Sequence, residues 1–179
     1  MKKSILIFSA FLCLLLNSCS NDDGFYRLVE PVALNQFCYG PNIGDDFNVA
    51  KAFNSAPQML STDVYTTTVI ITDSNFSLNT GVIVGMGSLV TLTFTGNQNF
   101  AIQSGLYSIG DDTATVGNVS VSYSLDFDTA QQLNESIVIQ NGYLRVRPYN
   151  DGFAIEIDGR NEDDVRFHGN FLGNLILLN

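Results

Sequence analysis

Few side chains in this sequence could carry out catalysis. His168 is the one histidine of the chain, so a Ser-His-Asp triad would have to use it. Its place in an alternating run just before Gly169 instead predicts an outward-facing or hydrogen-bonded histidine. Cys38 has no basic neighbour in the sequence, which predicts an inert thiol. One histidine and one such cysteine cannot build a usual zinc site, and no glycine-rich phosphate loop precedes a helix.

Carboxylates are the abundant reactive groups. A glycoside hydrolase needs two of them across a cleft, and Glu135, Glu156 and Glu162 are the candidates. Because Glu156 alternates with apolar residues, it is better explained as a solvent-facing side chain. We therefore expect that the protein is not an enzyme, with a small carboxylate-dependent glycoside hydrolase as an alternative.

Oxygen ligands cluster between Asp158 and Asp164. Calcium prefers such ligands in loops, so this segment is a candidate structural calcium site, although it lacks EF-hand spacing. The alternative is an ordinary solvated acidic loop, and no other cofactor is expected. The candidate ligands are Asp158, Asn161, Glu162, Asp163 and Asp164.

One predicted strand combines tyrosines with arginines. Alternation places Tyr143, Arg145 and Arg147 on one side, and Tyr107 and Tyr149 are further candidates. Ring faces beside arginines predict a ligand surface, with carbohydrate as the expected ligand class. The alternative is cross-strand pairing of the arginines with Glu156 and Asp158.

The charge balance excludes one class of partner. The 179 residues carry a formal net charge of −10, and phosphate recognition needs clustered Lys and Arg. Nucleic acid is therefore not an expected partner. Apolar residues make up 45% of the chain, which is typical of a folded domain rather than a disordered one.

The N-terminus is typical of a secretory signal peptide. Lys2 and Lys3 precede an uncharged run over 5–16, and twelve helical residues span only about 18 Å, too short for a bilayer core. Leu16-Asn17-Ser18-Cys19 resembles the lipobox of bacterial lipoproteins. This resemblance implies a signal peptide over 1–18, a lipid on Cys19 and a tether over 19–24.

The acidic pair after Cys19 resembles the surface-export signal of Bacteroidota lipoproteins, which implies an outer-membrane protein exposed at the cell surface. Asp112-Thr113-Ala114 and Asp128-Thr129-Ala130 resemble the O-glycosylation motif of the same phylum, with Thr113 and Thr129 as acceptors. Removal of 1–18 leaves six Lys and Arg against 18 Asp and Glu. Cys38 would then be a lone thiol, so no intrachain disulfide is expected.

Strand patterns begin with Val64 to Thr72, which is rich in Thr, Val and Ile. The next predicted strands are Val82 to Met86 and Leu89 to Thr95, split by Gly87-Ser88. We expect an irregular segment over 25–62, with a short helix beginning at Asp45 or Asp46 and ending near Phe53. The following segment over 63–179 is predicted to form the β domain. Its clearest strand runs from Val119 to Phe127, where apolar residues alternate with Ser and Asp.

Turn signals recur at roughly ten-residue intervals through the C-terminal third. Asn141-Gly142 predicts a hairpin turn, Asn150-Asp151-Gly152 predicts another, and the apolar run Leu175–Leu178 predicts a strand covered on both sides. The expected fold class is an all-β, antiparallel β-sandwich of jelly-roll or similar type, with a closed antiparallel β-barrel as the alternative.

Three segments of the last 100 residues resemble a broad group of small Bacteroidota surface lipoproteins. They are the segments 105–107, 142–146 and 168–175. The resemblance implies fold and location only. We expect a lipid-anchored envelope protein acting as a non-catalytic binding module for carbohydrate, or else a structural partner of other outer-membrane proteins.

Overall fold

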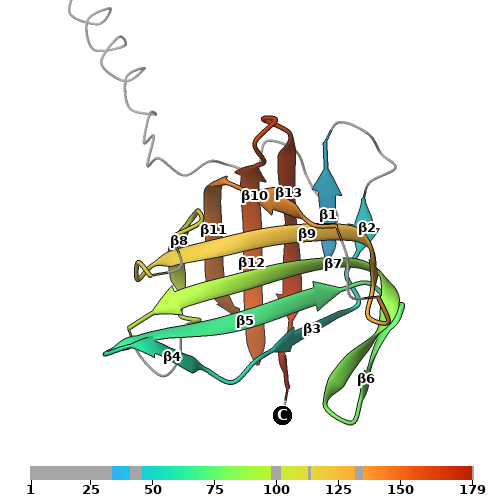
Figure 1. The fold of residues 1–179 in the computed structure, drawn as a ribbon, viewed down its shortest axis with the longest axis horizontal. Helices are drawn as coiled ribbons and strands as arrows, with labels where there is room; N and C mark the ends of the chain where they lie inside the picture. The colour runs from blue at the N-terminus through green and yellow to red at the C-terminus, as the bar shows by residue number, and fades with distance from the viewer. Residues whose placement is uncertain (1–33, 41–45, 98–101, 113, 132–134, 179) are drawn as a thin grey trace, which may run out of the picture.

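The computed structural model describes residues 34–40, 46–97, 102–112, 114–131 and 135–178, and their regular structure is entirely β-strand (Figure 1). The all-β prediction is therefore confirmed for this part of the chain. No helix among the described residues has the length and apolar character needed to cross a bilayer. The predicted signal peptide, Cys19 and Thr113 lie outside the described residues.

The strands form two limbs of one sheet, which cross each other steeply in Figure 1. The front limb contains β3 (Lys51–Asn54), β4 (Gln58–Ser61), β5 (Val64–Thr72), β6 (Phe76–Asn79), β7 (Val82–Gly96), β9 (Asn118–Asp128), β10 (Ile137–Ile139) and β14 (Ile176–Leu177). The back limb contains β8 (Gly105–Ile109), β11 (Asn141–Tyr149), β12 (Gly152–Arg160), β13 (Arg166–Gly173), β1 (Gln36–Tyr39) and β2 (Phe47–Asn48).

The sheet is continuous, mixed and open. Its order is β14-β3-β5-β7-β9-β8-β11-β12-β13-β1-β2, and β8 joins the limbs by pairing with β9 in parallel and with β11 in antiparallel. The prediction of a sandwich is corrected, because a sandwich needs two separate sheets. The closed barrel is corrected as well, because β14 and β2 end the pairing path as edges. The sheet is also not purely antiparallel as predicted, because β14 pairs with β3 in parallel, as β8 does with β9.

Buried and exposed side chains alternate along the long strands, and these strands curl around the core. In β9, Val119, Val121 and Tyr123 are buried, as the sequence pattern predicts. The two predicted strands around Gly87-Ser88 form the single strand β7, whose register with β9 shifts between Gly87 and Leu89. The Asp73 carboxylate accepts a hydrogen bond from the Ser88 N–H at this shift (2.8 Å). Such bulges bend a strand and increase its twist.

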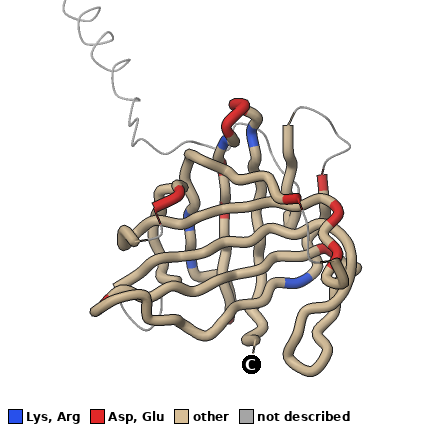
Figure 2. Tube along the Cα trace, viewed as in Figure 1, with Lys and Arg blue, Asp and Glu red and all other residues tan. Residues whose placement is uncertain are grey.

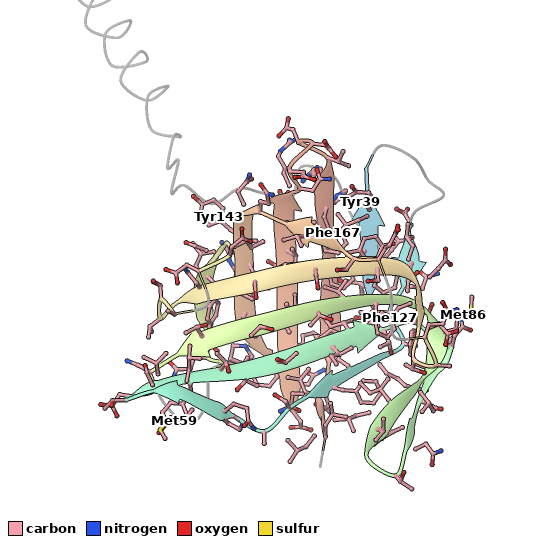
Figure 3. All side chains as sticks on the ribbon, viewed as in Figure 1. Tyr39, Met59, Met86, Phe127, Tyr143 and Phe167 are labelled. Atoms are coloured by element: carbon pink, nitrogen blue, oxygen red, sulfur yellow. The ribbon has the colours of Figure 1, made fainter. Side chains whose placement is uncertain are left out.

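Stacked aromatic rings hold the two limbs together. Phe37 of β1 stacks on Phe47 and on Phe167, with ring centroids 5.6 Å and 5.5 Å apart. Tyr123 of the front limb contacts Phe47 and Phe167 at 5.7 Å and 5.0 Å. These four residues close a ring of contacts, named here the aromatic ring cluster. Tyr39 packs beside it, against Tyr123, on the side where Figure 3 labels Tyr39 and Phe167.

Three local predictions are corrected. The helix expected to end near Phe53 is replaced by β2 and β3. Asn141-Gly142 makes no hairpin turn, because β10 pairs with β9 while both residues belong to β11. The run Leu175–Leu178 is not covered on both sides, since Leu177 is 55% exposed in an edge strand that pairs only with β3. The predicted turn at Asn150-Asp151 is confirmed.

Candidate functional site

Four of the five predicted tyrosine and arginine side chains lie in one row on the outer face of β11. Leu144 and Val146 are buried in the core, so alternation turns Tyr143, Arg145, Arg147 and Tyr149 outward. We name these four residues the Tyr–Arg row. Tyr143 is 43% exposed and Tyr149 is 42% exposed. The two tyrosines are six positions apart along the strand, which is about 20 Å.

Tyr149 borders a hollow of about 350 Å³ at one end of the row. Arg147 and Glu156 share this hollow and form an ion pair with each other, which confirms the alternative expectation of cross-strand pairing for this arginine. Asn170 is 8% exposed at the same place, and its Oδ1 accepts a hydrogen bond from the Asn35 N–H at 2.9 Å. The hollow therefore combines the Tyr149 ring, the Arg147–Glu156 ion pair and the side-chain amide of Asn170, which is held in place by its hydrogen bond.

Tyr143 borders a larger hollow at the other end, of about 710 Å³. Asp158 and Arg166 both line it and are joined by two hydrogen bonds of 2.9 Å, from Nε and Nη2 of the guanidinium to the two carboxylate oxygens. Both side chains are about one-fifth exposed, at 22% and 23%. A bidentate pair of this kind fixes the position of both groups. Figure 3 shows Tyr143 at the end of β11 that borders this hollow.

Tyr107 does not belong to this surface. It pairs with Leu144 and faces the core at 6% exposure, where its ring meets Phe94 edge-on at 5.0 Å. Its hydroxyl accepts a hydrogen bond from the Gln103 N–H (2.8 Å) and donates one to the Gln103 carbonyl (3.0 Å). Burial raises the pKa of Tyr107, and the bond to Gln103 opposes that rise. In β8 it is Leu106, at 51% exposure, that faces outward beside Arg145.

The candidate calcium ligands do not converge. Asp158 pairs with Arg166, and Asp164 pairs with Arg160 (3.3 Å). Asn161 Oδ1 accepts hydrogen bonds from the backbone N–H groups of Asp163 and Val165, so it shapes the loop instead of facing a cation. Figure 2 shows the acidic segment at the tip of the β12–β13 connection. Among the described residues, no group of three or more His, Cys, Asp and Glu could hold a metal ion.

The candidate catalytic carboxylates are also separated. Glu156 lies in the Tyr149 hollow with Arg147. Glu135 lines a different hollow of about 440 Å³, together with Asp126. Glu162 is an exposed residue of the β12–β13 loop. The three predicted glutamates therefore do not share a cleft.

Strand pairing does bring together residues that the sequence keeps apart. Cys38 of β1, His168 of β13 and Asp158 of β12 are successive partners across three strands, and Tyr143 continues the same line on β11. His168 faces outward, as predicted, but it is buried at 7% exposure. Sequence spacing could not reveal this line, because 120 positions separate Asp158 from Cys38.

The described residues of the two candidate glycosylation motifs make hydrogen bonds. Asp112 accepts hydrogen bonds from the Thr115 hydroxyl and the Ala114 N–H, and these bonds lower its pKa below the usual range, the Thr115 bond contributing most. Thr129 Oγ1 accepts a hydrogen bond from the Gly85 N–H (3.0 Å) and donates one to the Gly85 carbonyl (3.1 Å). Glycosylation of Thr129 would therefore cost it the bond that it donates.

Comparison of the chain with family models, with curated proteins and with solved structures finds no match in any of the three.

Proposed function

We propose that this chain is a non-catalytic binding module that holds a neutral glycan along the outer face of β11. One observation carries the proposal. The two exposed tyrosines of the Tyr–Arg row lie at opposite ends of one strand, and each borders a hollow that also contains an arginine–carboxylate pair. Binding sites usually combine apolar or aromatic surface with a few positioned polar groups.

The charges of the two hollows favour an uncharged ligand. Arg147 is balanced by Glu156, and Arg166 is balanced by Asp158. Guanidinium donors and carboxylate acceptors together can hydrogen-bond to the hydroxyl groups of a sugar, which both donate and accept. A polyanion would instead have to compete with the Glu156 and Asp158 carboxylates for the two guanidinium groups, and the acidic protein would repel it. The 20 Å between the tyrosines favours an extended chain over a single sugar.

The test is a glycan array probed with the purified protein, first with calcium and then with chelator. We expect a neutral oligosaccharide to bind in both conditions. Tyr143→Ala and Tyr149→Ala should each weaken that binding by about tenfold or more, as expected for central aromatic contacts. Tyr65→Ala is the matched control, because Tyr65 lies on β5 in the other limb. A blank array, or a hit that both row variants retain, would refute the proposal.

The proposed location is the outer membrane, held by a lipid on Cys19 with the domain exposed at the cell surface. Several acyl chains on one residue would give stable anchoring, because one chain alone holds a protein only marginally. Cys19→Ala should move the protein from the membrane fraction to the soluble fraction of its host. Unchanged fractionation would contradict the anchor.

An assembly role is the second candidate. The hairpin of β6 and the first part of β7 projects from the sheet in Figure 1. It exposes Leu78, Val82 and Met86, at 42%, 61% and 58%. If the array is blank, co-purification of another envelope protein, lost in Val82→Asp, would favour this role.

A further inference from the structure

The hairpin of β6 and the first part of β7, residues 76–86, is called here the projecting hairpin, and it carries no charge. From Ser74 to Gly110 the sequence contains no Asp, Glu, Lys, Arg or His. The hairpin is held by four residue pairs and projects from the sheet in Figure 1. Figure 2 shows acidic residues where the hairpin joins the sheet and no charged residue along it. The hairpin can therefore leave water without desolvating an ion.

Apolar side chains occupy both faces of the projecting hairpin. Direct partners in antiparallel strands share a face, so Leu78 and Ile83 lie on one face, and Val82 lies with Asn79 on the other. Leu78 and Val82 are exposed, and Ile83 is half-buried. An antiparallel sheet usually turns a polar face to water. A protein surface would cover one face of the hairpin, whereas a lipid layer surrounds both, so two apolar faces favour lipid.

The base of the hairpin is fixed to the domain. The Phe76 side chain is buried, and its backbone carbonyl accepts a hydrogen bond from Lys51 Nζ. On the opposite strand, Gly85 exchanges hydrogen bonds of 3.0 Å and 3.1 Å with Thr129 Oγ1. The tip is therefore presented by an ordered base. Because little ordering is left to pay for, contact with a surface costs less conformational entropy than it would for a flexible loop.

We propose that the tip of the projecting hairpin inserts into the lipid surface of a membrane, with Leu78 and Val82 at the boundary between headgroups and acyl chains. Four residue pairs at about 3.4 Å each give a length of about 14 Å. Elements that lie in this boundary are buried by about 5–10 Å, so the tip can enter while the base stays outside. Shallow insertion also keeps the outward backbone groups of both strands within reach of water.

This lipid contact is distinct from the functions proposed above. The glycan face belongs to β11 in the other limb, and the contact requires no acyl chain on Cys19. It assigns the hairpin to lipid in place of the protein partner of the assembly role. An uncharged lipid surface is the expected one, because anionic headgroups would repel a chain of net charge −10.

The test uses tryptophan as a reporter, because the chain has none. Val82→Trp places it on the hairpin, and Val138→Trp is the matched control on β10, where Val138 is also exposed. Each full chain is mixed with phosphatidylcholine vesicles whose brominated acyl chains quench tryptophan on contact. We expect quenched, blue-shifted emission for Val82→Trp and neither change for Val138→Trp. Attachment through the N-terminal residues would act on both reporters alike, so the difference between them reports on the hairpin.

A second pair of variants tests the opposite face of the hairpin. In the Val82→Trp background, Leu78→Asp should lower the equilibrium constant for insertion about tenfold or more, and Leu78→Val should retain the quenching. The melting temperature checks that each variant stays folded. No quenching at position 82, equal quenching at positions 82 and 138, or full quenching with Leu78→Asp would overturn the proposal. Absence of quenching together with co-purification of an envelope protein would assign the hairpin to assembly.

Discussion

Removal of Phe37 tests whether the aromatic ring cluster holds the curled sheet together. The side chain is fully buried and stacks on rings from two other strands. Gly169 lies beneath it, so close that a Cβ there would come within 2.5 Å of the Phe37 ring. Because backbone forms this wall, the space left by Phe37→Ala cannot collapse easily. We therefore expect a loss of about 4 kcal/mol, in the middle of the range of about 3–5 kcal/mol for Phe→Ala.

The assay is urea unfolding followed by far-ultraviolet circular dichroism. With a slope of about 2 kcal/mol per molar urea, a loss of about 4 kcal/mol lowers the midpoint by about 2 M. The near-ultraviolet signal of tyrosine supplies a second probe, because the chain has no tryptophan and Tyr123 belongs to the cluster. Coincidence of the two curves would show that the limbs unfold together.

Val138→Ala is the matched control, since Val138 is 46% exposed on β10 and a surface substitution should change stability by less than about 0.5 kcal/mol. A milder pair, Phe37→Leu with Phe167→Leu, measures the stacking itself and should show a coupling of about 0.5–1.5 kcal/mol. If Phe37→Ala costs no more than Val138→Ala, the cluster does not join the limbs and the reasoning fails.

Two further predictions follow from backbone and hydroxyl geometry. Gly142→Ala should cost about 2–3 kcal/mol in urea unfolding, because φ is +130° and a Cβ would lie 2.3 Å from the Asp158 carbonyl oxygen; Gly105→Ala, with open space around it, should cost less than about 1 kcal/mol. Because the pKa of Tyr107 is raised in the folded state, this hydroxyl contributes to stability. The contribution is fully present below the unfolded pKa of 10.0 and is lost as pH rises through the folded pKa. Midpoints measured from pH 7 to pH 11 should therefore fall less steeply for Tyr107→Phe than for the unaltered protein, and parallel curves would contradict this assignment.

The strands that were predictable from sequence are those with one face in the core and one in water. β5 has the bounds predicted for it, and β9 extends the run from Val119 to Phe127 by one residue at each end. In both cases the period of two comes from burial on one side alone. The short strands β1, β2 and β3 have too few residues to show a period, which explains the mistaken helix near Phe53.

Gly142 shows why turn signals can mislead. Asn-Gly favours a two-residue hairpin because both residues tolerate positive φ. Here the glycine is required for a different reason, a close approach of β11 to the backbone of Asp158 and Gly159. Whether such a glycine serves a turn or a close approach of two strands depends on how distant strands pair. Strand pairing also joins the two limbs into one sheet, because β8 pairs with β9 in parallel through two residue pairs.

The part of the candidate site that depends on alternation along β11 was predictable. The part that depends on side chains from the neighbouring strands β12 and β13 was not. Tyr143, Arg145 and Arg147 share a face because Leu144 and Val146 occupy the core. Tyr107 was misplaced because Gly105-Leu106-Tyr107 has no clear period. Ile109, two positions later and also buried, was the signal that Tyr107 faces inward.

The tyrosines of the Tyr–Arg row allow a binding role to be separated from a structural one. Tyr143 and Tyr149 point away from a core that Leu144 and Val146 already fill, so their removal should alter binding with little effect on stability. A substitution that only damaged the fold would lower glycan affinity and the urea midpoint together. Weakened glycan binding at an unchanged urea midpoint would therefore assign a binding role to these two side chains, and a fall in both would contradict it.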